Sequence, residues 1–289
     1  MEACELFVGQ RANEREAAVS RGPERPAFPS KDQLRICFAH PAYQMAARFT
    51  AREPGIAHVQ VRTLSDLEAE LPRTDVLVVS QMWRNELAAG ADRLRFIQSI
   101  SAGVDQYDQE VLRARGIRLA SAAGITAHAV AEHAMALILA LRRHLHTGRD
   151  NQARKHWRGM ISDIPSREDQ LGGKTLLIIG LGRIGTRLAK LASAFEMRVV
   201  ATRRDASRGA DGVDAVHAHD RLPGMLPSAD IIAVTCPLTP ATRNLIDAEA
   251  LAAMKPSAHL INVARGAIVD EDALIRAPQE ARLAAAGSM

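Results

Sequence analysis

Short apolar segments alternate with helical patterns along most of the chain, from Leu34 onward. In the first part, apolar runs predict strands at 34–39, 59–64, 75–80 and 94–101, and the spacing at 42–52 predicts a helix. Parallel strands need crossover connections, which are usually helices. The β-α-β rhythm therefore predicts an α/β fold with a parallel sheet covered by helices.

A second series of the same kind follows a long apolar pattern at 126–146. This pattern has few polar residues before its basic end, which predicts a helix buried between domains or subunits. The run 175–180, TLLIIG, is continuously apolar, as expected for a strand buried on both faces. Further strands are predicted at 197–202, 230–238 and 259–264, and helices at 183–195 and 242–254.

The length of 289 residues favours two domains. The segment 1–33 is rich in Pro, Gly and charged residues and contains no apolar core. We therefore expect a disordered lead-in that is not a signal peptide. The domains are predicted at 34–127 and 128–289.

Composition narrows the function classes. Aromatic residues make up only 3% of the chain, which argues against stacking on single-stranded nucleic acid. The net charge of +4 is mild, and the basic run 142–158 has no recognition motif beside it. The run favours a solvated helix end or a patch facing an anionic ligand, so we expect no nucleic-acid partner.

Cysteine usage and hydropathy point to a cytoplasmic protein. Cys4, Cys37 and Cys236 fit neither a metal spacing nor a disulfide framework, which is typical of a reducing compartment. No apolar run approaches the length that crosses a bilayer, so we expect no membrane partner. The sequence HAHD at 217–220 has no second ligand pair nearby, and we interpret it as a solvated loop rather than a metal site.

The sequence GLGRIG at 180–185 carries the clearest chemistry. It follows an apolar strand and opens a helix, which is the context that the dinucleotide fingerprint requires. Gly180 permits the tight turn, Gly182 allows a pyrophosphate to approach, and Gly185 lets helix and strand pack closely. The alternative is a glycine-rich turn without a ligand. The predicted cofactor-binding residues here are Gly180, Leu181, Gly182, Arg183, Ile184 and Gly185.

The end of the next strand bears on the choice of dinucleotide. NAD-binding proteins usually carry an acidic residue there, which bonds the ribose hydroxyls. This chain has Arg203 and Arg204 instead, and Asp205 comes late. Two guanidinium groups suit a 2′-phosphate, so NADP is favoured over NAD as the cofactor. The alternative is that both arginines are merely exposed.

Three stretches together resemble the D-isomer-specific 2-hydroxyacid dehydrogenases, notably glyoxylate/hydroxypyruvate reductases and phosphoglycerate dehydrogenase-like members. The stretches are AVAEHAMALILALRR, GKTLLIIGLGRIGTRLAKLASAF, and the segment from CPLTPATRNLID to INVARGAIVDEDAL. The resemblance implies two Rossmann-like doubly wound parallel-sheet domains, the first being the flavodoxin-like substrate domain. It also implies a homodimer, expected around the helix at 127–146, and hydride transfer between a nicotinamide and a small 2-keto or 2-hydroxy acid.

Individual residues follow from the same resemblance. Arg265 resembles the catalytic arginine that binds the substrate carboxylate and polarises the keto oxygen. Ala102 and Gly103 resemble the loop whose backbone N–H groups hold that carboxylate. Met82 and Trp83 fall where the family lines its substrate pocket, although either could be ordinary core. The remaining cofactor-binding residues that the resemblance implies are Cys236, Pro237, Thr242, Val263 and Ala264.

The resemblance also implies a general acid that this sequence does not contain. In the family, a histidine near the C-terminus, held by a glutamate, protonates the forming alkoxide. Here the segment RLAAAG is followed only by Ser288 and Met289, so the C-terminal part is expected to be incomplete. We expect weak dinucleotide binding and little turnover. The alternative is a catalytically inactive, dinucleotide-binding remnant of such an enzyme.

Overall fold

The computed structural model describes residues 27–53, 55–209, 212–279 and 283–288, and these residues form two compact units. Unit 1 ends at Ala122 and unit 2 begins at Ala123. Most of the predicted disordered lead-in, together with Cys4, lies outside the described residues. Both units are α/β with parallel sheets, which confirms the predicted fold class.

Unit 1 contains one five-stranded parallel sheet with the strand order β2-β1-β3-β4-β5. This is the flavodoxin-like order, in which the chain reverses direction across the sheet between β1 and β3. Leu77 and Ile97 are fully buried on these strands. The strands are β1 (Arg35–Ala39), β2 (Ala57–Val61), β3 (Val76–Val79), β4 (Phe96–Ser99) and β5 (Arg118–Ala120), and the helices are α2 (Met45–Thr50), α3 (Leu64–Glu70) and α4 (Gln109–Ala114).

Unit 2 contains a six-stranded parallel sheet with the order β11-β10-β9-β6-β7-β8. Counted within the unit, this is the Rossmann order, and its switch point lies between β6 and β9. The strands are β6 (Thr175–Ile179), β7 (Arg198–Thr202), β8 (Ala215–His217), β9 (Ile231–Val234), β10 (His259–Asn262) and β11 (Ala285–Ser288). The helices are α5 (Ala127–Arg142), α6 (Leu145–Ala153), α7 (Arg183–Ala194), α8 (Leu222–Met225), α9 (Ala248–Ala253) and α10 (Glu271–Gln279).

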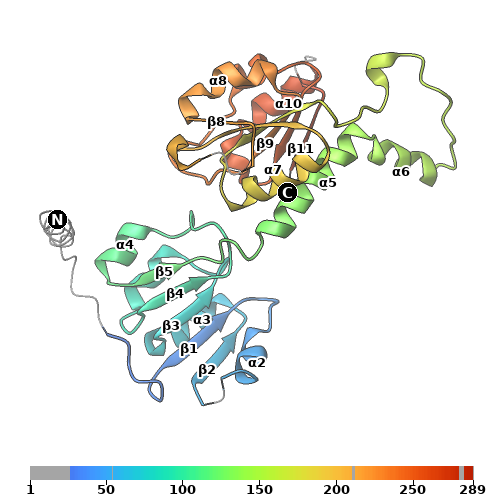
Figure 1. Ribbon diagram of the computed structural model, residues 1–289. Helices are drawn as coiled ribbons and strands as arrows, with labels where there is room; N and C mark the ends of the chain where they lie inside the picture. Colours follow the sequence, from blue (N-terminus) through green and yellow to red (C-terminus); the bar gives the residue numbers. More distant parts are fainter. Residues whose placement is uncertain (1–26, 54, 210–211, 280–282, 289) are drawn as a thin grey trace, which may run out of the picture. The chain divides into compact units, whose positions relative to one another are not determined.

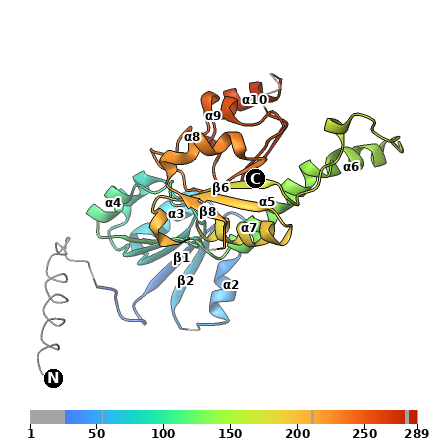
Figure 2. The same ribbon diagram turned by 45° about the horizontal axis from the view of Figure 1, so that its top comes forward.

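Alternate residues of β6 enter two separate cores on the two faces of this sheet. Leu176 and Ile178 pack with α5 and α7, whereas Leu177 and Ile179 pack with α8, α9 and α10. Figure 2 shows these two helical layers above and below the strands. Burial on both faces explains why β6 is continuously apolar in sequence.

The long helical pattern at 126–146 is divided in the structure. Helix α5 ends at Arg142, and His144 takes a left-handed backbone conformation with φ of 51° before α6 begins. Ala131, Ala134 and Ile138 pack inside unit 2 against α7 and the sheet. These residues of α5 are therefore buried within their own unit, whereas Leu137 and Leu141 are only partly buried.

One further expectation differs from the structure. The helix predicted at 242–254 is shorter, because Asn244 has a φ of 51° and Asp247 caps a helix that starts at Ala248. None of the described helices has both the length and the apolar character that a membrane crossing requires.

Candidate functional site

The turn after β6 has a backbone shape that only glycine fits. Gly180 has a φ of 101°, and a Cβ there would lie 2.7 Å from the backbone nitrogen of Cys236. The hydroxyl of Thr235 donates a hydrogen bond of 2.8 Å to the carbonyl of Gly180. The turn is thus pressed against the end of β9, at the switch point of the sheet.

The other two glycines have different local roles. A Cβ on Gly185 would lie 2.7 Å from the carbonyl oxygen of Gly180, so this glycine allows α7 to pack on the turn. A Cβ on Gly182 would meet nothing within 4 Å, and it would project into open space. Gly182 is also the N-cap of α7 and offers no side-chain cap. The first N–H groups of the helix have no intrahelical partners and can accept an anion.

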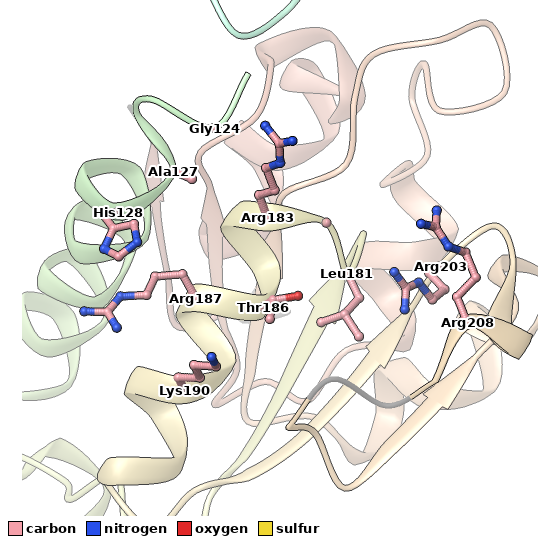
Figure 3. A pocket seen from close by; sticks show the side chains of 11 residues that line it. Gly124, Ala127, His128, Leu181, Arg183, Thr186, Arg187, Lys190, Arg203 and Arg208 are labelled. Carbon is pink, nitrogen blue, oxygen red and sulfur yellow. The ribbon is translucent and has the colours of Figure 1, made fainter. Parts of the chain in front are cut away.

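This turn forms one wall of a pocket with a strongly cationic lining (Figure 3). No aspartate or glutamate is among its lining residues. A pyrophosphate placed here would meet the helix N–H groups, the positive charge of the lining, and a backbone that is accessible because Gly182 has no Cβ. The lining residues are Gly124, Ala127, His128, Leu181, Gly182, Arg183, Thr186, Arg187, Lys190, Arg203 and Arg208.

One of the two predicted arginines at the end of β7 lines this pocket. Arg203 lies in the lining and donates a hydrogen bond of 3.1 Å to the carbonyl of Gly209. Arg204 is exposed and is not in the lining. Arg208 stands beside Arg203 instead, on the same side of the pocket (Figure 3). The sequence analysis missed Arg208 because a short 3-10 turn at 206–208 brings it back toward the strand end.

The fingerprint arginine has a structural contact of its own. Arg183 donates a hydrogen bond to the carbonyl oxygen of Ala123. Its guanidinium group also lies where a Cβ on Gly124 would be, and Gly124 has a φ of 106°. Arg183 therefore fixes the segment that leads into α5 against the glycine turn.

The segment after β9 is held by its own side chains. The hydroxyl of Thr242 donates to the carbonyl of Pro237 at 2.7 Å and accepts from the backbone N–H of Thr239 at 2.8 Å. Cys236 is buried, and burial raises the pKa of its thiol to about 11. The thiol is therefore protonated at neutral pH.

The predicted substrate arginine lies just after β10 in a braced loop. Asn262 donates through its side chain to the carbonyl of Arg265 at 2.9 Å and accepts from the N–H of Ala264 at 3.0 Å. Arg265 is exposed, and its guanidinium donates to the carbonyl of Ala264 at 2.9 Å. Val263 is buried beside it. Sequence reasoning missed Asn262 as the residue that fixes this loop.

The predicted substrate-binding residues of unit 1 fall into two groups. Met82 and Trp83 are buried in the core of the unit, and the Trp83 ring lies 5.9 Å from the Tyr107 ring. Ala102 and Gly103 lie in the loop after β4, where Ala102 is exposed. Their roles at a substrate remain predictions.

His259 lies at the N-terminal end of β10, whereas Arg265 follows the C-terminal end of that strand. The Nδ1 atom of His259 is 3.3 Å from a guanidinium nitrogen of Arg142, and it must accept because guanidinium only donates. Burial, reinforced by the charge of Arg142, lowers the pKa of His259 to about 4. No group of three potential metal ligands occurs among the described residues, which include the HAHD segment.

Comparisons with known proteins agree with this geometry. Residues 135–288 match the family model of the D-isomer specific 2-hydroxyacid dehydrogenase, NAD binding domain. The chain is 34% identical over 235 residues to a glyoxylate reductase of Pyrococcus furiosus, covering 76% of this chain and 69% of that protein. It is 37% identical over 227 residues to a D-3-phosphoglycerate dehydrogenase of Mycobacterium bovis, covering 76% of this chain but only 41% of that protein.

A solved structure extends the likeness to the fold. The D-lactate dehydrogenase of Aquifex aeolicus, complexed with NAD and lactic acid, matches with a TM-score of 0.76 and 28% sequence identity. The match covers 88% of this chain and 76% of that one.

Proposed function

Because the chain belongs to the D-isomer specific 2-hydroxyacid dehydrogenase family, we propose that it is a nicotinamide-dinucleotide-dependent oxidoreductase acting on a small 2-keto or 2-hydroxy acid. The observation that carries the proposal is the glycine turn at the Rossmann switch point. At this turn the backbone of Gly182 is accessible because it has no Cβ, and it lies at a helix N-terminus in a cationic pocket. The bound nicotinamide would supply the hydride, and the residues of the chain would bind and orient the reactants.

Arg203 and Arg208 support a preference for NADPH over NADH. Both line the pocket beyond the turn, and no acidic side chain lines it with them. The carboxylate of Asp205 is held by the N–H of Ser207 at 3.2 Å and by its hydroxyl at 2.5 Å. Both bonds go to Oδ1 and turn the carboxylate toward Ser207, which does not line the pocket. The two guanidinium groups that do line it suit a 2′-phosphate.

Arg265 is the candidate for substrate binding. A guanidinium stays protonated at all relevant pH values and can hold a carboxylate by two bonds. The two side-chain bonds of Asn262 fix the backbone from which Arg265 projects. We expect Arg265→Lys to raise KM for the keto acid and to lower kcat, because an ammonium lacks the planar fork.

A second candidate function is dinucleotide binding without rapid turnover. It is favoured by the position of His259, which lies at the opposite end of β10 from Arg265 and is neutral at pH 7 because its pKa is about 4. A neutral histidine with an acceptor Nδ1 cannot protonate a forming alkoxide there. Loss of general acid catalysis lowers rates by about two to four orders of magnitude.

One assay separates the two candidates. NADPH oxidation is followed at pH 7 with glyoxylate or hydroxypyruvate, using the polypeptide of these 289 residues and its Arg265→Lys variant. Turnover of about 1 per second or faster, reduced in the variant, supports the enzyme. NADPH binding with a turnover at least a hundredfold slower than about 1 per second supports the second candidate. A chain that binds no NADPH contradicts both.

We also propose that the chain forms a homodimer. Support comes from the segment that follows α5. Trp157, Met160 and Ile164 are 96%, 101% and 74% exposed and lie within eight residues of one another in sequence. A contiguous exposed apolar patch marks an association surface, and we propose that these side chains belong to one. Sedimentation at micromolar concentration should give a dimer, and Trp157→Ser should shift it toward the monomer.

A further inference from the structure

One face of helix α7 carries three cations in succession. Arg183, Arg187 and Lys190 are spaced four and three residues apart, so they lie along the same side of the helix. All three line the pocket beside the glycine turn, and His128 of α5 joins them. In Figure 3 Arg187 reaches toward α5, below the ring of His128.

This arrangement is unfavourable for an isolated helix. Like charges at these spacings destabilise a helix. Arg183 is in the first turn, where the helix dipole also opposes a cation, and α7 has no acidic residue in that turn. No ion pair joins Arg187 or Lys190 to an acidic side chain within the described ranges.

Arg187 also has a hydrogen-bond donor that lacks an acceptor in the described part of the chain. Its Nε atom is buried and has no hydrogen-bond partner among the described residues. A buried donor without a partner is unfavourable. An anion bound by this guanidinium would neutralise the repulsion along the helix.

The dinucleotide does not account for these charges. Its pyrophosphate would be placed at Gly182. Its ribose phosphate would be placed at Arg203 and Arg208, which Figure 3 shows on the other side of Leu181 from Arg187 and Lys190. Arg183 is engaged by the carbonyl of Ala123. Arg187, Lys190 and His128 therefore form a separate group on the α5 side of the pocket.

We propose that His128, Arg187 and Lys190 form a second anion site that binds a phosphate group, adjacent to the dinucleotide turn and distinct from it. Inorganic phosphate and a phosphorylated small molecule present the same tetrahedral phosphate group, and the experiment below distinguishes these two sources. The proposal rests on the proposed function only in calling the neighbouring turn a dinucleotide site.

The test uses inorganic phosphate as the probe at low ionic strength, with binding measured by calorimetry. We expect saturable binding that is weakened at least tenfold in the double variant Arg187→Gln, Lys190→Gln. Arg187→Lys in an otherwise native chain should retain most of it. Arg221→Gln, which removes an exposed cation of unit 2 outside the pocket, should change the affinity less than twofold. Circular dichroism establishes that each variant is folded.

A second arm repeats the titration with saturating NADPH and with phosphoglycolate in place of phosphate. Retained phosphate binding supports a separate site, and tighter binding of phosphoglycolate identifies a phosphorylated molecule as the ligand. Loss of phosphate binding with NADPH, or equal binding by the double variant and the native chain, overturns the inference. If NADPH does not bind but phosphate still depends on Arg187 and Lys190, the proposed function fails and this inference stands.

Discussion

Alanine substitutions at Gly180 and Gly182 should have different effects, the first on the stability of the fold and the second on dinucleotide affinity. At Gly180, the φ of 101° is strained for any L-residue, which costs about 1–3 kcal/mol. The added Cβ would also lie 2.7 Å from the backbone of Cys236, and overpacking costs about 1–3 kcal/mol more. Gly180→Ala should thus lower the free energy of unfolding by about 2–6 kcal/mol, a large part of the stability of an ordinary domain.

Gly182→Ala should behave in the opposite way. Its Cβ meets nothing within 4 Å and its φ of −99° suits any residue. We expect stability within about 1 kcal/mol of the native value, since fewer unfolded conformations offset any small strain. The methyl would stand where a pyrophosphate approaches the backbone, so dinucleotide affinity should fall about tenfold, or about 1.4 kcal/mol.

Urea unfolding followed by circular dichroism measures the first effect, and NADPH titration of the folded variants measures the second. Gly148→Ala is the matched control, because its Cβ also meets nothing within 4 Å but it lies in the exposed helix α6. It should leave NADPH affinity unchanged. If Gly182→Ala binds NADPH as tightly as the native chain does, the turn is not the phosphate site.

Two further predictions concern charged groups. Arg208→Gln should reduce the NADPH-to-NADH affinity ratio at least fivefold, whereas Arg204→Gln should leave the ratio nearly unchanged. Each variant is titrated with both cofactors, and equal effects of the two substitutions would contradict the assignment of Arg208 to the 2′-phosphate. His259 has a pKa of about 4 in the folded chain, whereas an unperturbed histidine in the unfolded chain has a pKa near 6.5. As the pH falls from 6.5 to 4, the unfolded chain therefore takes up a proton that the folded chain does not. The free energy of unfolding should thus be unaffected by His259 above pH 6.5 and should fall by up to about 3 kcal/mol toward pH 4. Urea unfolding at pH 7.5 and at pH 4.5 measures this loss of stability. The loss should be smaller for His259→Gln, which keeps an acceptor for Arg142. It should be unreduced in the native chain and in the exposed control His217→Gln.

Much of the fold was predictable because burial on both faces leaves a continuous apolar signal. This holds for β6, β7, β9 and β10, whose sequences have few polar interruptions. The short edge strands β8 and β11 were missed, since Ala215–His217 and Ala285–Ser288 are brief and contain small or polar residues. Their pairing is set by the neighbouring strand and not by their own pattern.

The candidate site was predictable only where it depends on local sequence. The glycine turn is local, so its position after β6 follows from the motif and the strand before it. Arg208 was missed because its place in the pocket depends on a loop conformation. Arg187 and Lys190 were missed because cations at helical spacing normally indicate a solvated face, and only the packing of α5 beside α7 makes a pocket that they line.

Calorimetric titration of the native chain with NADPH, and in parallel with NADH, measures whether the turn 180–185 binds a nicotinamide dinucleotide. We expect saturable binding of one NADPH per chain, at least fivefold tighter than binding of NADH. Folded protein that releases no heat and shows no saturation with either dinucleotide at millimolar concentration would contradict it.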